Sequence, residues 1–161
     1  MKRSRTRDRA PGTNGKAALF ELRQSLPSQV AAISPFVVRL MRFIARFRKE
    51  DGSRSDIELA VREALANAMI HGNHEHADKR VYVRCRCGQD GEVSITIRDQ
   101  GQGFDQLGVP DPEAPENRLS THGRGIFLMR KLMDEVSFDE GGMAVHMRKG
   151  PTNLTARNTR K

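Results

Sequence analysis

Two polar side chains interrupt an otherwise apolar helical stretch of this 161-residue chain. Residues 58–73, ELAVREALANAMIHGN, repeat alanine, leucine and methionine at helical spacing, yet they place Glu63 and Asn67 four positions apart. Residues at i and i+4 share one helix face. A carboxylate and a carboxamide there can act as a general base and as an oxygen ligand for Mg²⁺. A polar pair on a partly exposed stripe, with Asn67 bonded back to the backbone, explains the spacing equally well.

Two glycine-rich segments follow further along the chain. In DQGQGF, Gly101 and Gly103 let the backbone approach a ligand closely and adopt positive φ. In HGRGI, Gly123 and Gly125 stand just before an expected helix, where free N–H groups favour an anion. Taken singly, each segment also fits a tight turn or a helix start without any ligand.

The carboxylate that precedes the first glycine segment adds a recognition element. Asp99 ends a strand pattern whose apolar residues alternate, and it suits a charge-assisted bond to an exocyclic amine such as that of adenine. Alternatively, Asp99 only caps the turn. About twenty residues separate the two glycine segments, and loops of that length in compact domains are usually lids or disordered.

The elements that must position these residues follow from periodicity and turn signals. Helices are expected from Ser34–Pro35 to about residue 47, from Ser55 or Asp56 to about residue 70, and over residues 124–134. Strands are expected at 17–26, 79–87 and 92–98, with two more between residues 135 and 149. This order predicts an α+β fold, a two-layer sandwich with a mixed, mostly antiparallel sheet and helices on one face.

Composition indicates a soluble globular domain with basic ends. Hydrophobic residues make up 37% of the chain, and arginines interrupt its longest apolar stretch, so no membrane span is expected. Of the net charge of +8, residues 1–9 carry +4 and residues 148–161 carry +5, which leaves −1 for the rest. We therefore expect basic, disordered tails at 1–16 and 150–161 around a folded domain at 17–149.

A zinc site is the rival interpretation for the histidines of HGNHEH and the cysteines of CRC. Structural zinc usually requires two to four residues between its cysteines, whereas Cys85 and Cys87 are separated by one. A C-x-C pair on a strand is more often two small buried side chains. With two cysteines and no apolar signal core, the chain is expected in the reducing cytoplasm.

Together, the three segments resemble the N, G1 and G2 boxes of the GHKL ATPase superfamily, whose ATP-binding unit is the Bergerat fold. The order and spacing of EALAN, DQGQGF and HGRGI carry this resemblance. NAMIHGN and GRGIFLMRKLMDEVSF are typical of the bacterial anti-sigma factor serine/threonine kinases. The similarity covers roughly residues 19–149. A complete sensor histidine kinase is not expected, because residues 1–18 do not resemble a dimerisation domain with a phosphoacceptor histidine.

The resemblance implies a role for each matching residue. Glu63 matches the general base, Asn67 the magnesium ligand, and Asp99 the residue that reads the adenine amine. The other residues implied in ATP binding are Gly101 and Gly103 at the adenine, and Gly123, Arg124, Gly125 and Ile126 at the phosphates. Residues 106–121 match the ATP lid, and the prolines at 110, 112 and 115 are a departure from the family pattern.

The resemblance also implies ATP and Mg²⁺ as cofactors, and protein partners. Family members bind a sigma factor, phosphorylate a serine or threonine of a small STAS-type anti-anti-sigma protein, and commonly form homodimers through the region matching residues 36–47. The leading hypothesis is therefore an anti-sigma protein kinase. The runner-up is an ATP-gated interaction module without kinase activity, and a basic protein associated with RNA or DNA comes third.

Overall fold

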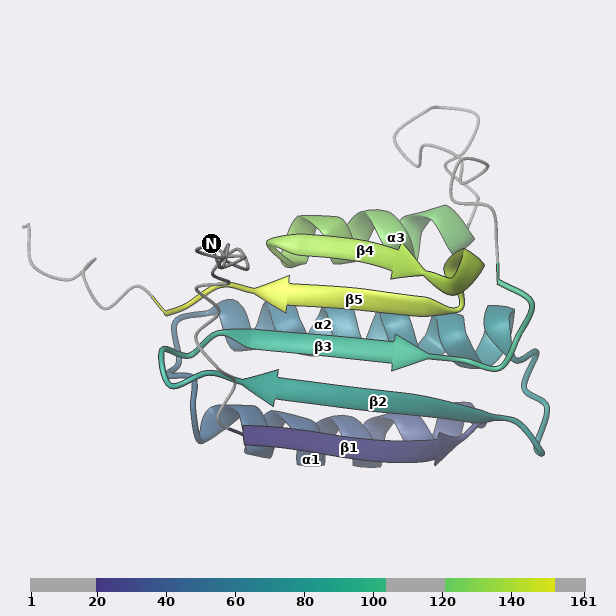
Figure 1. Cartoon of the computed structure of the whole chain (residues 1–161), viewed down its shortest axis with the longest axis horizontal. Coiled ribbons are helices and arrows are strands. Elements are labelled where there is room, and N and C mark those ends of the chain that lie inside the picture. Colours follow the sequence, from purple (N-terminus) through teal and green to yellow (C-terminus); the bar gives the residue numbers. More distant parts are fainter. Residues whose placement is uncertain (1–19, 104–120, 153–161) are drawn as a thin grey trace, which may run out of the picture.

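The computed structural model describes residues 20–103 and 121–152, which form a two-layer α+β sandwich (Figure 1). The sheet has five strands in the order β1-β2-β3-β5-β4, and all four pairings are antiparallel. The strands are β1 (Phe20–Pro27), β2 (Arg80–Cys87), β3 (Val93–Arg98), β4 (Glu135–Asp139) and β5 (Ala144–Lys149). The described α-helices are α1 (Ile33–Ala45), α2 (Ser53–Ala66) and α3 (Thr121–Leu132). The expected fold class is confirmed.

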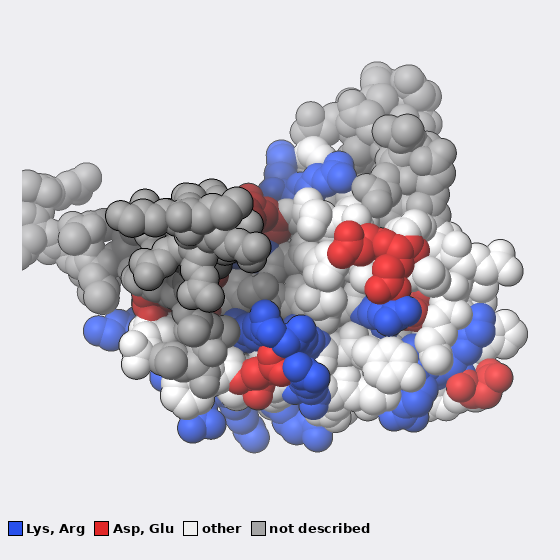
Figure 2. Space-filling view, in the orientation of Figure 1, with Lys and Arg blue, Asp and Glu red and all other residues white. Residues whose placement is uncertain are grey.

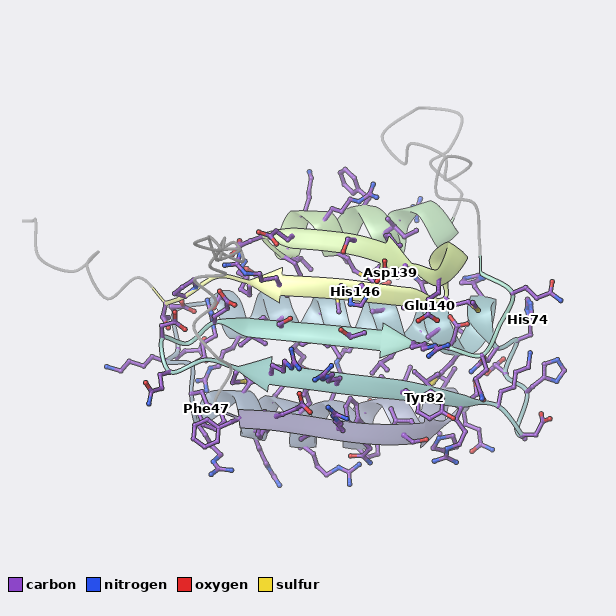
Figure 3. All side chains as sticks on the ribbon, in the orientation of Figure 1. Phe47, His74, Tyr82, Asp139, Glu140 and His146 are labelled. Atoms are coloured by element: carbon purple, nitrogen blue, oxygen red, sulfur yellow. The ribbon has the colours of Figure 1, made fainter. Side chains whose placement is uncertain are left out.

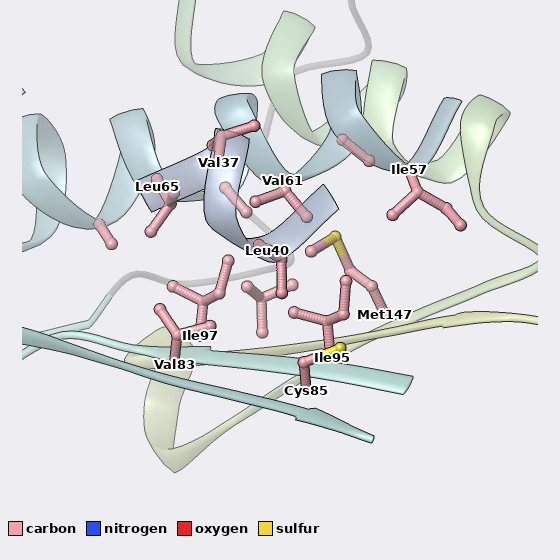
Figure 4. Packing of buried hydrophobic residues seen from close by; sticks show 14 of the residues in the cluster. Val37, Leu40, Ile57, Val61, Leu65, Val83, Cys85, Ile95, Ile97 and Met147 are labelled. Atoms are coloured by element: carbon pink, nitrogen blue, oxygen red, sulfur yellow. The ribbon is translucent and has the colours of Figure 1, made fainter. Parts of the chain in front are cut away.

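The core lies between the sheet and the helices, which all cover the same face (Figures 1 and 4). Alternate strand residues point inward, and the buried ones on β2 and β3 include Val83, Cys85, Ile95 and Ile97. They meet fully buried side chains of the helices, among them Leu40, Ile57, Val61 and Leu65. Burying an aliphatic side chain of this size stabilises a fold by roughly 2 kcal/mol. The side chains buried between the sheet and the helices therefore supply much of the stability of the sandwich.

The apolar side of helix α1 packs into the core of the molecule. Phe36, Leu40 and Ile44 are fully buried, whereas Arg39 and Arg42 are exposed. The interpretation of this segment as a packing helix with a solvated basic face is therefore confirmed.

The predicted starts of the first two helices are wrong by a few residues. Helix α1 begins at Ile33, after a 3₁₀ turn, and the hydroxyl of Ser34 accepts a hydrogen bond from Arg62 Nη1 (3.1 Å) instead of capping. Helix α2 begins at Ser53, whose backbone N–H donates to Asp51 Oδ1 (3.0 Å). The capping side chain therefore lies two positions before the helix, outside the window in which Ser55 and Asp56 were expected to act.

Cys85 and Cys87 both lie in the core, with no exposed surface. Contact with Cys87 and burial raise the pKa of the Cys85 thiol. Two buried thiols at these positions serve as small packing groups. Within the described residues, no three histidine, cysteine or acidic side chains are placed to hold a metal ion, and no helix has the length and apolarity needed to cross a membrane.

A buried arginine joins the end of α1 to the opposite edge of the core. The side chain of Arg48 is only 3% exposed, and its guanidinium donates to Ser53 Oγ (2.6 Å), Gly91 O (2.7 Å) and Gly150 O (2.7 Å). Asp51 provides the nearby negative charge, at 3.4 Å. The guanidinium of Arg48 therefore links the start of α2, the turn between β2 and β3 and the segment after β5.

Replacement of Arg48 by methionine is expected to lower the free energy of unfolding by about 3 kcal/mol, because buried carbonyl groups lose a charged donor. Urea denaturation followed by circular dichroism measures the change. Arg39→Met, on the exposed side of α1, is the matched control and is expected to stay within about 0.5 kcal/mol of the parent. Equal stabilities of the two variants would contradict a structural role for Arg48.

Candidate active site

Helix α2 changes its geometry at the candidate magnesium ligand. The α-helix ends at Ala66, and residues Asn67–Gly72 continue as a single π-helical turn, in which Asn73 N donates to Ala68 O (2.8 Å). Isolated π turns inside or after α-helices occur frequently at functional sites. The prediction of an uninterrupted α-helix to Ile70 therefore missed a local widening that begins at Asn67.

Glu63 and Asn67 lie against the first turns of α3. A Cβ atom placed on Gly125 would stand 3.1 Å from both Glu63 Oε2 and Asn67 Nδ2, so a side chain at this position would press on both polar groups. Within the described part of the chain, neither side chain forms a hydrogen bond, so the alternative in which Asn67 bonds back to the backbone is not observed. Both polar groups remain available to a ligand.

Asp99 is 8% exposed at the end of β3. Its Oδ1 accepts a hydrogen bond from Gly101 N (2.7 Å), so the carboxylate does cap the turn, as the alternative interpretation predicted. Its Oδ2 lies against Gly72, where any side chain would collide with it, and forms no hydrogen bond within the described residues. Burial raises the pKa of Asp99, and the Gly101 N–H opposes that rise. One oxygen thus holds the turn and the other is left for a ligand.

A buried asparagine fixes this turn to the end of the π turn. Asn73 is fully buried, its Oδ1 accepts from Gln100 N (2.8 Å), and its Nδ2 donates to Arg80 O (3.0 Å). The side chain of Gln100 in turn accepts from Arg80 N (2.7 Å). Asn73 therefore positions Asp99 relative to Asn67. Asn73 was not predicted as a site residue, although the pair Gly72–Asn73 directly after a helix is a sequence signal of a special turn.

The two glycines after Asp99 serve different purposes. Gly103 has φ +75° and lies so close to the Gly141 carbonyl that no side chain fits there. Gly101 does not have positive φ, which corrects the expectation for that residue. Residue 101 must instead be glycine because the backbone there lies close to the carbonyl of Gly72, with which a Cβ atom would collide.

Helix α3 begins earlier than expected, at Thr121, so Gly123 and Gly125 lie within the helix and not before it. The first four N–H groups of a helix have no intrahelical acceptor, and these include Gly123 but not Gly125. Ile126 is 3% exposed and faces inward, whereas Arg124 is exposed. Gly125 therefore contributes through its lack of a side chain.

A hollow that is partly open to solvent joins these elements. It is lined by Ala64, Asn67, Ala68, His71, Gly72, Asp99, Gly103, Ile126, Met129, Phe138 and Gly142. Of the predicted site residues, Asn67, Asp99, Gly103 and Ile126 form its wall, while Glu63 and Gly125 adjoin Asn67 next to it.

Several of these wall residues were missed from the sequence. Phe138 and Gly142 come from β4 and the turn after it, and no motif connected them to α2. The lid expected at residues 106–121 lies outside the described residues, apart from Thr121 at the start of α3.

Comparison with known proteins agrees with this geometry. Residues 25–149 match the family described as histidine kinase-like ATPase domain. The anti-sigma F factor of Heyndrickxia coagulans is 32% identical over 119 residues, which cover 70% of this chain and 80% of that protein. The anti-sigma F factor of Oceanobacillus iheyensis is 34% identical over the same shares. A serine-protein kinase RsbW of Bacillus licheniformis is 38% identical over 102 residues, 58% of this chain and 62% of that protein.

A solved structure shares the fold. The RsbU and RsbW domains of Rv1364c from Mycobacterium tuberculosis align over 80% of this chain and 31% of that chain, with a TM-score of 0.55 and 18% sequence identity. Identity at this level supports the architecture and nothing finer. The family match and the anti-sigma relatives cover most of the chain, and the hollow between α2, β3 and α3 lies within the matched region. The chain belongs to the family of histidine kinase-like ATPase domains.

Proposed function

We propose that this protein is an anti-sigma regulator that binds ATP with Mg²⁺ and phosphorylates a serine or threonine of a STAS-type anti-anti-sigma protein, so controlling the release of a sigma factor. The observation that carries the proposal is the meeting of Glu63 and Asn67 at Gly125, beside the hollow whose wall also holds Asp99. The relatives supply the regulatory context, since they are an anti-sigma F factor and a serine-protein kinase.

Asp99 would select adenine. Among the described residues no donor bonds to its Oδ2, which lies in a buried setting, and an exocyclic amine can donate to this oxygen. Guanine presents a carbonyl oxygen at the equivalent ring position, and two acceptors repel each other there. Gly72, Gly101 and Gly103 keep side chains out of the space that surrounds this carboxylate, which supports a flat base as the ligand.

Asn67 would hold the metal ion. Its carbonyl oxygen has no protein donor among the described residues and lies where Gly125 leaves room, so the residues present fit a hard cation that keeps water and phosphate oxygens as its other ligands. When bound, Mg²⁺ would neutralise charge on the phosphates. The N-terminal turns of α3, with the N–H of Gly123, would face the same anionic groups.

Glu63 would act on the acceptor protein. The acceptor hydroxyl oxygen attacks the γ-phosphorus of ATP, the bond to the bridging oxygen breaks and ADP leaves, while the hydroxyl proton passes to a Glu63 carboxylate oxygen. Glu63 lies one helical turn before Asn67 on the same face of α2, so the base stands beside the residue assigned to the metal. Nucleotide binding alone does not require a carboxylate at this position.

The direct test is transfer of label from γ-labelled ATP to candidate STAS proteins of the same genome. We expect label on one serine or threonine of one such protein, and none when that residue is replaced by alanine. The full chain with Glu63→Gln is the matched enzyme control. Tight, ATP-dependent binding of the STAS protein without any labelling would instead identify an ATP-gated interaction module.

A further inference from the structure

The face of the sheet opposite the helices is covered by no described element (Figure 1). Strand β2 crosses this face, and its outward side chains are Arg80, Tyr82, Arg84 and Arg86. Alternate residues of a strand lie about 7 Å apart, which is comparable to the spacing of successive phosphates along an extended single strand of nucleic acid. The cations of β2 therefore stand at intervals that fit such a chain of phosphates.

Positive charge is in excess on the half of this face formed by β1, β2 and β3, and Figure 2 shows it low on the face. The arginines described there are Arg23, Arg80, Arg84, Arg86 and Arg98. Glu21 accepts bonds from three of them, each through its Nε atom, and Glu140 pairs with Arg98 (2.8 Å). Arg80 bonds instead to the hydroxyl (2.5 Å) and the carbonyl (3.1 Å) of Ser25. Five guanidinium groups thus share two carboxylates.

Tyr82 presents an aromatic ring in the middle of these arginines. The residue is 44% exposed, and Figure 3 labels it on β2. Its neighbours in register are Ser25 on β1 and Arg98 on β3. A shallow hollow beside it is lined by Arg84 and Thr96 among others. Exposed aromatic side chains on an open sheet are stacking platforms for unpaired bases.

Acidic side chains limit the basic area on the side of β4. Glu135 and Asp139 have side chains 68% and 63% exposed. The nearest cation, Arg148 of β5, already pairs with Glu135 (2.9 Å) and with Glu92 (2.7 Å). A polyanion is therefore attracted to the half over β1, β2 and β3 and repelled from the half over β4.

We propose that this half of the sheet face binds single-stranded nucleic acid. One unpaired base stacks on the ring of Tyr82, and the neighbouring phosphates accept hydrogen bonds from Arg84 and Arg98. A positively charged groove combined with an aromatic platform is the usual arrangement of sites that bind single strands without sequence preference. The contacts need phosphates and an unpaired base but no particular sugar, so RNA and DNA single strands both fit.

The exposed ring favours this ligand over other polyanions. An acidic protein segment would use the arginines but has no base to stack on Tyr82, and a duplex keeps its bases paired. The face lies on the opposite side of the sheet from α2 and α3, so a bound strand leaves the hollow at Asn67 accessible. Binding at Tyr82 does not require the proposed kinase activity.

Fluorescence anisotropy of the full chain with a labelled oligouridylate of about ten nucleotides tests the proposal. This probe lacks adenine, the base expected at Asp99. Saturable binding is expected, and Tyr82→Ala is expected to weaken it about tenfold, whereas Tyr82→Phe keeps the ring and stays within about twofold of the parent. Arg84→Gln/Arg98→Gln is expected to weaken binding about tenfold and to reduce the slope of log affinity against log salt by about 1.

The matched control is Arg39→Gln/Arg42→Gln on the exposed side of α1, which removes the same charge and is expected to stay within about twofold of the parent. Circular dichroism verifies that every variant is folded. Three outcomes would overturn the proposal: a parent chain that does not bind, equal affinities of the two Tyr82 variants, or equal losses in the two arginine pairs. A duplex of the same length bound as tightly as the single strand would also exclude it. So would polyglutamate bound more tightly than the oligouridylate and with no dependence on Tyr82.

Discussion

The variant Glu63→Gln is expected to transfer phosphate about 10²–10⁴-fold more slowly than the parent chain while binding ATP with an affinity within about twofold. Glutamine keeps the size of the side chain but cannot accept the proton of the acceptor hydroxyl. The carboxylate adjoins Gly125 and Asn67 without forming a hydrogen bond in the described residues, so its removal is not expected to disturb either. Single-turnover transfer to the labelled STAS protein measures the rate, and calorimetry measures binding.

Asn67→Ala provides the contrast that separates the two roles. Loss of the carbonyl oxygen is expected to weaken binding of ATP in the presence of Mg²⁺ by at least about tenfold, and to change binding in the presence of a chelator much less. Equal loss of affinity in the Glu63 and Asn67 variants would contradict the assignment of base and metal ligand. A Glu63→Gln variant with parental turnover would show that the carboxylate is not the general base.

The pairing of Glu63 with Asn67 could be predicted from the sequence because helical spacing alone puts residues i and i+4 on one face. The same holds for the sheet, whose alternating patterns at 80–87 and 93–98 were expected at nearly these bounds. Both inferences need only local periodicity. The position of Asp99 at the end of β3 followed in the same way.

Contacts between distant segments could not be read in this way. Gly72 is glycine because the Asp99 carboxylate lies against it, and Asn73 is buried because it bonds to Gln100 and Arg80. Each requirement arises only after β3 has been placed beside the π turn. Arg48 was not singled out from the sequence, because the carbonyl groups that accept its hydrogen bonds lie 43 and 102 residues further along the chain.

The variant Asp99→Asn is expected to bind ATP more weakly than the parent chain and to be more stable without nucleotide. The amide oxygen of asparagine can still accept from Gly101, so the turn is retained. The Nδ2 group, however, is a donor that would face the donating amine of adenine. Loss of a charge-assisted bond and the opposed donors are expected to reduce ATP affinity about 100-fold.

The same substitution is expected to stabilise the chain at neutral pH when no nucleotide is bound. Burial raises the pKa of Asp99 in the folded state above its ordinary value in the unfolded state, so folding favours the protonated carboxyl. Stability therefore falls as pH rises through these two values, and the ionised group opposes folding above them. An amide at this position has no charge to bury, and a gain below about 1 kcal/mol is expected because the site is partly open to solvent.

The pH dependence of this gain identifies its cause. Near pH 7 the Asp99→Asn variant should be more stable than the parent in urea denaturation, whereas in acid below the ordinary aspartate pKa the difference should vanish, because Asp99 is then protonated in both states. Asp78→Asn, at an exposed position, is the matched control and should show neither effect. A variant that loses ATP affinity but gains no stability would mean that the turn hydrogen bond from Gly101 outweighs the burial of the charge. A variant that keeps parental affinity would exclude Asp99 as the residue that selects the base.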